Sequence, residues 1–294
     1  MTSADFTRNS DNYCYRHPDR QSFVLCQRCL RTICPECQTQ AAVGVICPEC
    51  MKEQRSQATG AQRKAERRWA SSRPVAVSDS RPLATYGIIA VTALVYLVTL
   101  IPGFGDTVRE ALLFRARDVL FPDIVGTFQP WRIVTVALVH GSFIHVALNM
   151  LALLLIGRSL EPLLGRWRFI TLYVLSTIGG SAAVALIAPA IPVVGASGAI
   201  FGLFGALIVI GRHLGANIAG IAVVLGVNLV IGFIPGFNVS WQAHVGGLVT
   251  GLLVGLIFTR TRAPQQRTLQ IVLLSTVAVG LIALFFVARL LVLA

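Results

Sequence analysis

The sequence predicts an all-α polytopic membrane protein with a small soluble domain at its N-terminus. Mean hydropathy is +0.71, and only 13% of the 294 residues are charged, whereas a soluble domain has about 25%. Residues 1–82 are polar and basic, and the remainder is apolar with short basic loops. We therefore predict three parts: a small domain at residues 1–55, a basic flexible linker at 56–82 and a membrane domain at 83–294.

The N-terminal domain contains all seven cysteines of the chain. They form closely spaced pairs: Cys14 with His17, Cys26 with Cys29, Cys34 with Cys37, and Cys47 with Cys50. One such pair can bind a metal ion through a tight turn, and two pairs complete a tetrahedral site. An odd number of cysteines argues against disulfides, whereas the cysteines and His17 together supply ligands for two ions. We predict two structural Zn²⁺ ions, and no metal for catalysis because protein fills every ligand position.

The spacing leaves open which pairs share an ion. It resembles that of B-box-like fingers, in which the first pair joins the third and the second joins the fourth, but sequential pairing fits almost as well. So short a domain cannot bury a large core, and we expect metal to hold it together. The resemblance to interaction fingers implies a protein partner for this domain.

The net charge of +12 has a topological explanation. Arginine and lysine in short loops stay on the cytoplasmic side of a membrane, and no nucleic-acid recognition motif accompanies the charge, so nucleic acid is not an expected partner. The basic linker is predicted to be a solvated tether, and contact with anionic lipid is the alternative. The polar first residues do not form a signal peptide.

Seven apolar segments are candidate membrane spans. They are Leu83–Ile101, Ile133–Ile156, Phe169–Ala188, Ser197–Ile210, Ala216–Phe233, Ala243–Phe258 and Leu269–Leu293. The basic loops between spans two and three, four and five, and six and seven share a side with the linker. We therefore expect a multi-pass protein of the cell membrane with a cytoplasmic N-terminus and its C-terminus outside. The long loop 102–131, with mixed charges and apolar residues, is expected to lie in the membrane interface.

Polar side chains inside the spans are costly and usually functional. Ser197 follows a turn that contains two prolines, so we expect it to begin a helix, with small neighbours on either side. The free backbone amides in the first turn of that helix could bind an oxyanion. His244 begins another span at the same outer depth. Each helix carries a G-x-x-x-G face, so close packing could bring His244 within hydrogen-bond reach of Ser197 as a general base.

The residues favour a Ser–His dyad over a triad. No Asp or Glu follows Glu161, and Glu161 lies about 18 Å beyond Asn149 along its helix, at the inner end. His145 and Asn149 are four residues apart on one helix face and could donate hydrogen bonds to an oxyanion. His140 lies nearer the loop, and a functional and a structural role are equally consistent with its position.

Together these motifs resemble the rhomboid family over most of residues 83–260. The matching pieces are Trp131-Arg132, His140 with His145-x-x-x-Asn149, Gly195-Ala196-Ser197-Gly198, and Ala243-His244-x-x-Gly247-x-x-x-Gly251. The resemblance implies a six-helix core with a seventh C-terminal helix, embedded in the lipid bilayer. It implies an intramembrane serine endopeptidase that cuts transmembrane segments of protein substrates, with Ser197 as nucleophile and His244 as base.

The same resemblance implies further roles. Asn149, His145 and the Ser197 amide would stabilise the oxyanion, Gly198 would allow close backbone approach, and Trp131, Arg132 and Glu161 would be structural. Trp241 is expected near His244. Many relatives have tyrosine where this chain has Phe201, so stacking on the base is retained without the phenol hydroxyl. The alternative is an inactive rhomboid-like factor that binds membrane proteins, although such relatives usually lack the serine or the histidine.

Overall fold

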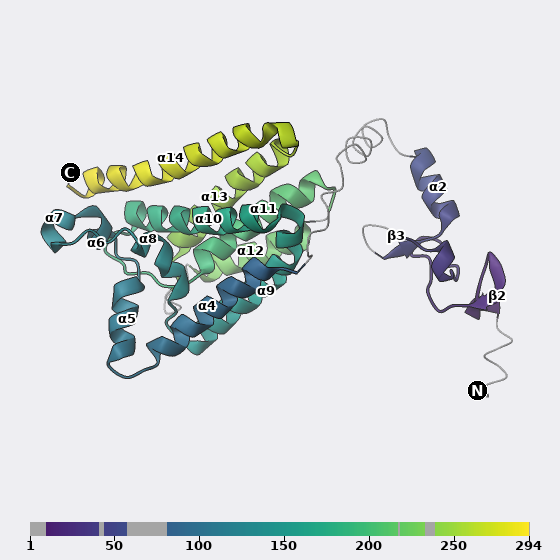
Figure 1. Ribbon diagram of the computed structural model, residues 1–294, viewed down its shortest axis with the longest axis horizontal. Coiled ribbons are helices and arrows are strands. Elements are labelled where there is room, and N and C mark those ends of the chain that lie inside the picture. Colours follow the sequence, from purple (N-terminus) through teal and green to yellow (C-terminus); the bar gives the residue numbers. More distant parts are fainter. Residues whose placement is uncertain (1–9, 41–43, 58–80, 217, 233–238, 294) are drawn as a thin grey trace. The chain divides into compact units, whose positions relative to one another are not determined.

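The computed structural model describes residues 10–40, 44–57, 81–216, 218–232 and 239–293. The chain divides into two compact units, residues 1–76 and 77–294, which are coloured purple to blue and blue to yellow in Figure 1. The predicted linker at 56–82 lies mostly outside the described residues, because 58–80 are not described. Each unit is therefore considered by itself.

The small unit consists of short elements around the cysteines. Its elements are η1 Ser10–Asn12, β1 Tyr13–Cys14, β2 His17–Gln21, η2 Pro35–Cys37, β3 Thr39–Gln40, β4 Val45–Ile46 and α2 Pro48–Gln57. Two antiparallel hairpins pair β1 with β2 and β3 with β4. Apart from cysteines, the buried core contains only Ile33 and Ile46 among the described residues. So few apolar side chains cannot stabilise a fold of this length without a cross-link or a metal.

The large unit is a helical bundle. Its helices are α4 Leu83–Thr99, α5 Phe104–Leu112, α6 Ala116–Leu120, α7 Pro122–Val125, α8 Arg132–Thr135, η3 Val136–Leu138, α9 Phe143–Leu164, α10 Arg166–Ile187, α11 Ser197–His213, α12 Ala219–Ile231, α13 Trp241–Arg260, η4 Pro264–Gln266 and α14 Arg267–Leu293. Four of these segments are long and apolar enough to cross a membrane, and α4, α11 and α12 are shorter apolar helices. The predicted fold class, a multi-pass membrane bundle with seven apolar helices, is confirmed.

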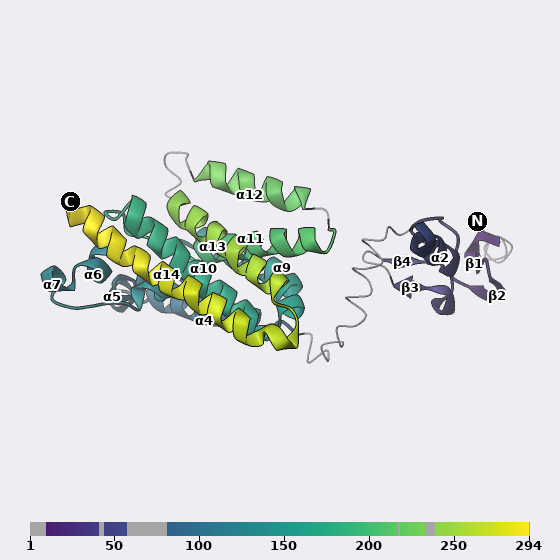
Figure 2. The ribbon, with the colours of Figure 1, turned by 90° about the horizontal axis from the view of Figure 1, so that it is seen from above.

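The helices α10, α11 and α13 form the centre of the bundle. They pack on one another along their lengths, and α14 lies along α10 and against α13 (Figures 1 and 2). The helix α12 contacts α11 at the edge of the bundle (Figure 2). Leu153, Leu172, Leu203 and Val254 are fully buried in the core between these helices. The outward faces of α12 and α14 remain apolar and exposed, as expected of surfaces that meet lipid.

The second span differs from the predicted Ile133–Ile156. Residues 132–138 form the short helices α8 and η3, and the spanning helix α9 begins after Ser142. The Ser142 hydroxyl accepts a hydrogen bond from the amide of His145 at 3.2 Å, which caps the helix. Gly165 ends it with a φ of +81°, a conformation that glycine adopts without strain. Hydropathy alone placed this span about ten residues too early because residues 133–139 are apolar but belong to the loop region.

A buried carboxylate joins α9 to α4. Glu161 is 3% exposed, and its two oxygens accept hydrogen bonds from the amides of Ala84 and Thr85, at 2.9 and 2.8 Å, and from the Thr85 hydroxyl at 2.7 Å. The carboxylate thus satisfies donors in the first turn of α4, where the helix dipole favours negative charge. Glu161 lies near the opposite end of α9 from His145 and Asn149, where its carboxylate binds the start of α4, as a structural role requires.

Replacing Glu161 with glutamine should destabilise the large unit by about 2–4 kcal/mol. The glutamine side chain keeps one acceptor oxygen, but its NH₂ group would face backbone N–H donors. The substitution also removes the negative charge that the helix terminus stabilises. Thermal unfolding of the full chain in detergent measures this loss. Ser159→Ala, an exposed change on the same helix, is the matched control and should leave the midpoint unchanged. An equal midpoint for Glu161→Gln would contradict the capping role.

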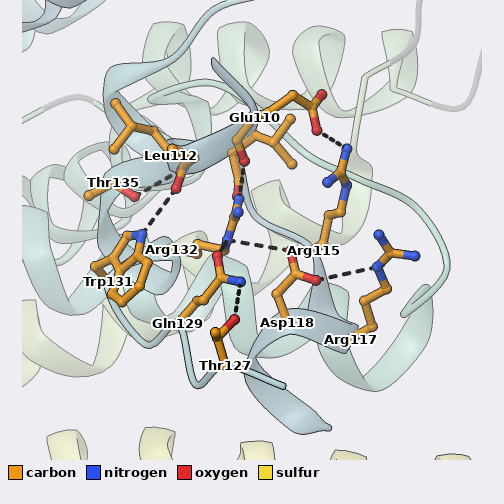
Figure 3. Close-up of polar contacts among 12 residues, drawn as sticks. Glu110, Leu112, Arg115, Arg117, Asp118, Thr127, Gln129, Trp131, Arg132 and Thr135 are labelled. Carbon is orange, nitrogen blue, oxygen red and sulfur yellow. Dashed lines mark hydrogen bonds and ion pairs between the residues drawn. The ribbon is translucent and has the colours of Figure 1, made fainter. Parts of the chain in front are cut away.

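Arg132 organises the region between α5 and α8, which is shown in Figure 3. Its guanidinium donates to the carbonyls of Glu110 at 2.5 Å and Leu113 at 2.7 Å and to the Gln129 side chain at 2.7 Å. It also pairs with the buried Asp118 carboxylate at 3.4 Å. Trp131 donates its indole N–H to the Ala111 carbonyl at 3.0 Å. The two residues hold the loop from several sides, which agrees with the structural role that the family resemblance implies.

Candidate active site and metal centres

Glycines bring α11 and α13 into backbone contact. A Cβ atom at Gly247 would collide with the carbonyl oxygen of Gly198, and one at Gly251 with the carbonyl oxygen of Gly202. A Cβ atom at Gly198 would lie 3.2 Å from the carbonyl oxygen of Ala243. We call this contact the glycine seam. Only glycine permits such an approach, and it holds the beginnings of α11 and α13, where Ser197 and His244 lie, against each other.

The His244 ring is held by an aromatic neighbour from α11. The rings of Phe201 and His244 are stacked at a centroid distance of 3.9 Å and an interplanar angle of 13°. Because Phe201 lies four residues after Ser197, both side chains are on the same face of α11. The family resemblance implied that Phe201 stacks on His244, and the structure shows this stack.

His244 is 5% exposed, and neither of its ring nitrogens has a hydrogen-bond partner within the described part of the chain. A hydrogen bond from the Ser197 hydroxyl to this ring is therefore not formed in this structure. Buried polar nitrogens are normally paired, so the two ring nitrogens of His244 are free to bond a group that enters the site. Catalytic hydrogen bonds often tighten only when substrate binds.

The segment before Ser197 is held by two histidines. Gly195 has a φ of +120°, and a Cβ atom there would lie 2.8 Å from His145 Nε2 and 3.9 Å from Ser197 Oγ. The amide of Ala196 donates to His140 Nε2 at 3.4 Å, and the rings of His140 and His145 meet edge to face at 4.9 Å. Glycine is needed at 195 both for its φ and because the imidazole of His145 occupies the space of a side chain.

His140 therefore belongs with the site residues. It is 2% exposed, and its position between the Ala196 amide and His145 explains its burial. Its spacing from His145 did not reveal this, because the two residues flank the start of α9 rather than sharing a helix face. Asn149 is also buried and donates to the His145 carbonyl at 2.9 Å, one turn earlier on α9.

A small cavity of about 20 Å³ adjoins Ser197. This is room for one water molecule. Its walls include Phe114, Val136, Ser181 and Val193, which come from four separate segments. No local sequence pattern marks these residues, because only the packing of α10 against the loop region brings them to Ser197. The Ser181 hydroxyl donates to the Ile133 carbonyl at 2.9 Å, which ties this wall together.

Comparison with known proteins identifies the family. The model of the Rhomboid domain matches residues 127–261. The chain is 30% identical over 181 residues to the "Putative rhomboid protease YdcA" of Bacillus subtilis, of which it covers 88%. The chain belongs to the rhomboid family.

Longer rhomboid proteins are also similar to the chain. It is 32% identical to Rhomboid protease GluP of Bacillus subtilis over 212 residues, which are 69% of this chain and 40% of that protein. It is 37% identical to RHOMBOID-like protein 4 of Arabidopsis thaliana over 141 residues, which are 46% of this chain and 35% of that protein. The chain thus spans well under half the length of these two relatives. The Rhomboid match ends before α14 and leaves out the small unit.

The small unit of this rhomboid gathers the eight sulfur and nitrogen ligands into two clusters. One contains Cys14, His17, Cys34 and Cys37, and the other contains Cys26, Cys29, Cys47 and Cys50. The first pair thus joins the third and the second joins the fourth, so the interleaved alternative is the one the structure adopts. Ligand atoms within each cluster lie within 4.8 Å of one another, as expected around a tetrahedral ion with bonds of about 2.3 Å.

Cysteine thiolates and a histidine nitrogen, the ligands in these clusters, are the ligand types that suit a divalent cation such as Zn²⁺. His17 Nδ1 lies 3.3 Å from Cys34 Sγ and 3.4 Å from Cys37 Sγ, and all the cysteines are free thiols. Burial and the neighbouring Cys14 and Cys34 thiols raise the pKa of Cys37 to about 11. Burial also raises the pKa of Cys14, but backbone hydrogen bonds from Cys34 and Arg16 outweigh it and bring this pKa to about 6. A bound cation would let all the thiols ionise together.

Proposed function

We propose that this rhomboid is an intramembrane serine endopeptidase that cleaves transmembrane segments of membrane proteins. The observation that supports the proposal is the glycine seam, which holds the first turns of α11 and α13 close together. Ser197 begins α11, and His244, which is buried, unpaired and stacked on Phe201, lies in the first turn of α13. The similarity to proteins named as rhomboid proteases supports the same reaction.

In the proposed reaction, Ser197 Oγ attacks the carbonyl carbon of the scissile peptide while His244 takes the hydroxyl proton. The resulting oxyanion would be stabilised by the Ser197 amide in the first turn of α11, His145 and Asn149. The C–N bond then breaks, and His244 gives its proton to the leaving amine. A water molecule then attacks the acyl-enzyme while His244 accepts its proton. The bond between the acyl carbon and Ser197 Oγ breaks, His244 returns the proton to Ser197 Oγ, and the new carboxyl group leaves.

The test is cleavage of a single-span reporter whose outer membrane boundary contains small, helix-breaking residues. The full chain, reconstituted in liposomes, is compared with Ser197→Ala and His244→Ala. Each change should lower the cleavage rate by at least about a thousandfold. Ser159→Ala and His213→Ala are matched controls in exposed positions away from the site and should retain full activity.

Labelling by a fluorophosphonate tests the nucleophile without a substrate. Ser197 should react in the wild type and should fail to react when His244 is changed to alanine. Cleavage that survives Ser197→Ala would exclude this mechanism. Folded wild-type protein that neither cleaves nor labels would instead support the inactive, membrane-protein-binding alternative.

Phe201→Leu should lower kcat/KM by about two- to tenfold. The substitution keeps an apolar side chain but removes the ring stacked on His244, and a stacked aromatic pair contributes about 0.5–1.5 kcal/mol. Phe201→Tyr keeps the stack and should retain most of the activity. Steady-state cleavage of the same reporter measures both variants. An unchanged kcat/KM in Phe201→Leu would show that stacking does not position the base.

We further propose that the small unit binds two structural Zn²⁺ ions in a B-box-like fold and serves as a docking module for a protein partner. The two interleaved clusters and a core with few apolar side chains besides the cysteines support the metal-stabilised fold.

We also propose that the protein resides in the cell membrane, with its N-terminus in the cytoplasm and its C-terminus outside. Reporter fusions at each terminus test the orientation, and a C-terminal reporter active in the cytoplasm would refute it.

A further inference from the structure

We infer that α14 positions the active site through Phe285 and Arg289, which hold the loop region that forms one wall of the cavity beside Ser197. This inference rests on the proposed protease function. Because α14 lies outside the matched Rhomboid segment, its role must be argued from this chain's own contacts. Both residues lie in the last third of α14. The helix α14 contacts α6, and Figure 1 shows its C-terminal part beside α6.

The helix α14 is fastened to the rest of the unit at both ends. Near its beginning, the buried Gln270 donates to the carbonyl of Thr261 at 2.9 Å and to its hydroxyl at 2.7 Å, and it accepts from Arg168 at 2.8 Å. Near its end, Arg289 makes the second set of polar contacts. The described side chains between Gln270 and Phe285 are partly or fully exposed. Leu274, Val277 and Leu281 in this stretch pack against the core, so α14 lies along the bundle and adds polar contacts at both of its ends.

Phe285 supports the wall of the cavity from behind. Its ring meets the ring of Phe114 edge to face, at a centroid distance of 6.3 Å and an angle of 66°. Phe114 is fully buried and lines the cavity together with Ser197. An edge-to-face pair of buried rings restrains both side chains. Phe285 therefore limits how far Phe114 can withdraw from the cavity.

Backbone hydrogen bonds connect Phe114 to the segment that precedes Ser197. Phe114 and Val193 exchange two hydrogen bonds, at 3.0 and 2.9 Å, and the amide of Gly195 donates to the Val136 carbonyl at 3.0 Å. Gly195 lies two residues before Ser197. Movement of Phe114 would thus shift both the wall and the segment that sets the Ser197 position, and errors of about 1 Å at a nucleophile strongly reduce rate.

Arg289 holds the same loop region by three contacts. Its guanidinium donates to the Leu120 carbonyl at 2.9 Å, pairs with Asp123 at 3.0 Å and lies 5.6 Å from the centroid of the Phe121 ring. These partners are in or beside α6 and α7, a few residues beyond Phe114. A guanidinium that binds a carbonyl and a carboxylate together fixes orientation better than either contact alone. Phe285 and Arg289 are therefore positioning residues rather than catalytic ones.

The proposal places the cavity beside Ser197 against the substrate side chain at the cleaved bond, so the test measures side-chain preference at that position. Two reporters, identical except for alanine or leucine at the residue whose carbonyl Ser197 attacks, are cleaved by the full chain in liposomes. Phe285→Ala should shift the ratio of their kcat/KM values by about tenfold toward leucine, since a retreating wall admits the larger side chain. Phe286→Ala, its exposed neighbour on α14, is the matched control and should keep the wild-type ratio.

Arg289→Ala should shift the ratio in the same direction, and Arg289→Lys should restore it, because lysine can still reach Leu120 and Asp123. Simple loss of stability would lower both kcat/KM values without changing their ratio. The inference is overturned if folded Phe285→Ala keeps the wild-type ratio or if Phe286→Ala changes it equally. Fluorophosphonate labelling of Ser197 separates the two proposals: an unlabelled wild type refutes the protease, whereas a labelled wild type with an unchanged ratio in the variants refutes only the role of α14.

Discussion

Removing the bound metal is expected to unfold residues 10–57 while the membrane-spanning unit stays folded. The buried core of the small unit consists of clustered cysteines with Ile33 and Ile46, so the proposed metal–ligand bonds would replace the apolar core of a larger domain. Structural zinc in comparable small domains contributes on the order of 10 kcal/mol or more to folding. The large unit has an extensive apolar core of its own and holds no cysteine.

Hydrogen exchange on the full chain distinguishes the two units. After treatment with a strong chelator, amides in residues 10–57 should lose their protection, whereas those of α10, α11 and α13 should keep it. Cys34→Ser should produce the same loss without chelator, and Asp19→Asn, an exposed change in β2 that is not a ligand, should not. Metal analysis of the purified chain should give two zinc ions per molecule. Full protection of residues 10–57 in metal-free protein would contradict a metal-held fold.

The two units differ in how far the sequence could predict them. Cysteine spacing identified the eight residues that the structure gathers into two clusters, since the turns that hold pairs such as Cys26 and Cys29 are local. It could not decide which pairs meet, because that depends on how the segments fold back on each other. In the large unit, hydropathy found the apolar helices, but it missed the start of α9, which depends on the hydrogen bond between Ser142 and His145.

The candidate site shows the same division between local and tertiary information. Ser197 and His244 could be predicted because each begins a helix with a G-x-x-x-G face, and such faces meet closely. Phe114 and Phe285 could not, because they reach the site through contacts between segments far apart in the chain. The sequence predicted that close helix packing could bring His244 within hydrogen-bond distance of Ser197. In the structure the two helices pack closely, but the hydrogen bond is not formed. The catalytic roles of Ser197, His244, Asn149 and His145 stay predictions.

Gly251→Ala is expected to prevent the large unit from folding correctly, or to destabilise it by more than about 4 kcal/mol. One methyl group is a small change, but at this position it would meet the backbone carbonyl of Gly202 rather than a side chain that could move aside. The α11 and α13 backbones would have to separate along the whole glycine seam. Thermal unfolding in detergent and the yield of monodisperse protein measure the effect.

Gly280→Ala is the matched control, because it adds the same atom to a helix where nothing lies within 4 Å of the new Cβ atom. It should leave the unfolding midpoint unchanged or raise it, since alanine favours the helix. Any Gly251→Ala protein that folds should also lose cleavage and fluorophosphonate labelling, because separating the seam moves His244 away from Ser197. Wild-type stability and labelling in Gly251→Ala would mean that the helices do not approach as closely as the seam requires. The Ser–His pair would then need another element to hold it, so this one methyl group tests the fold and the proposed chemistry together.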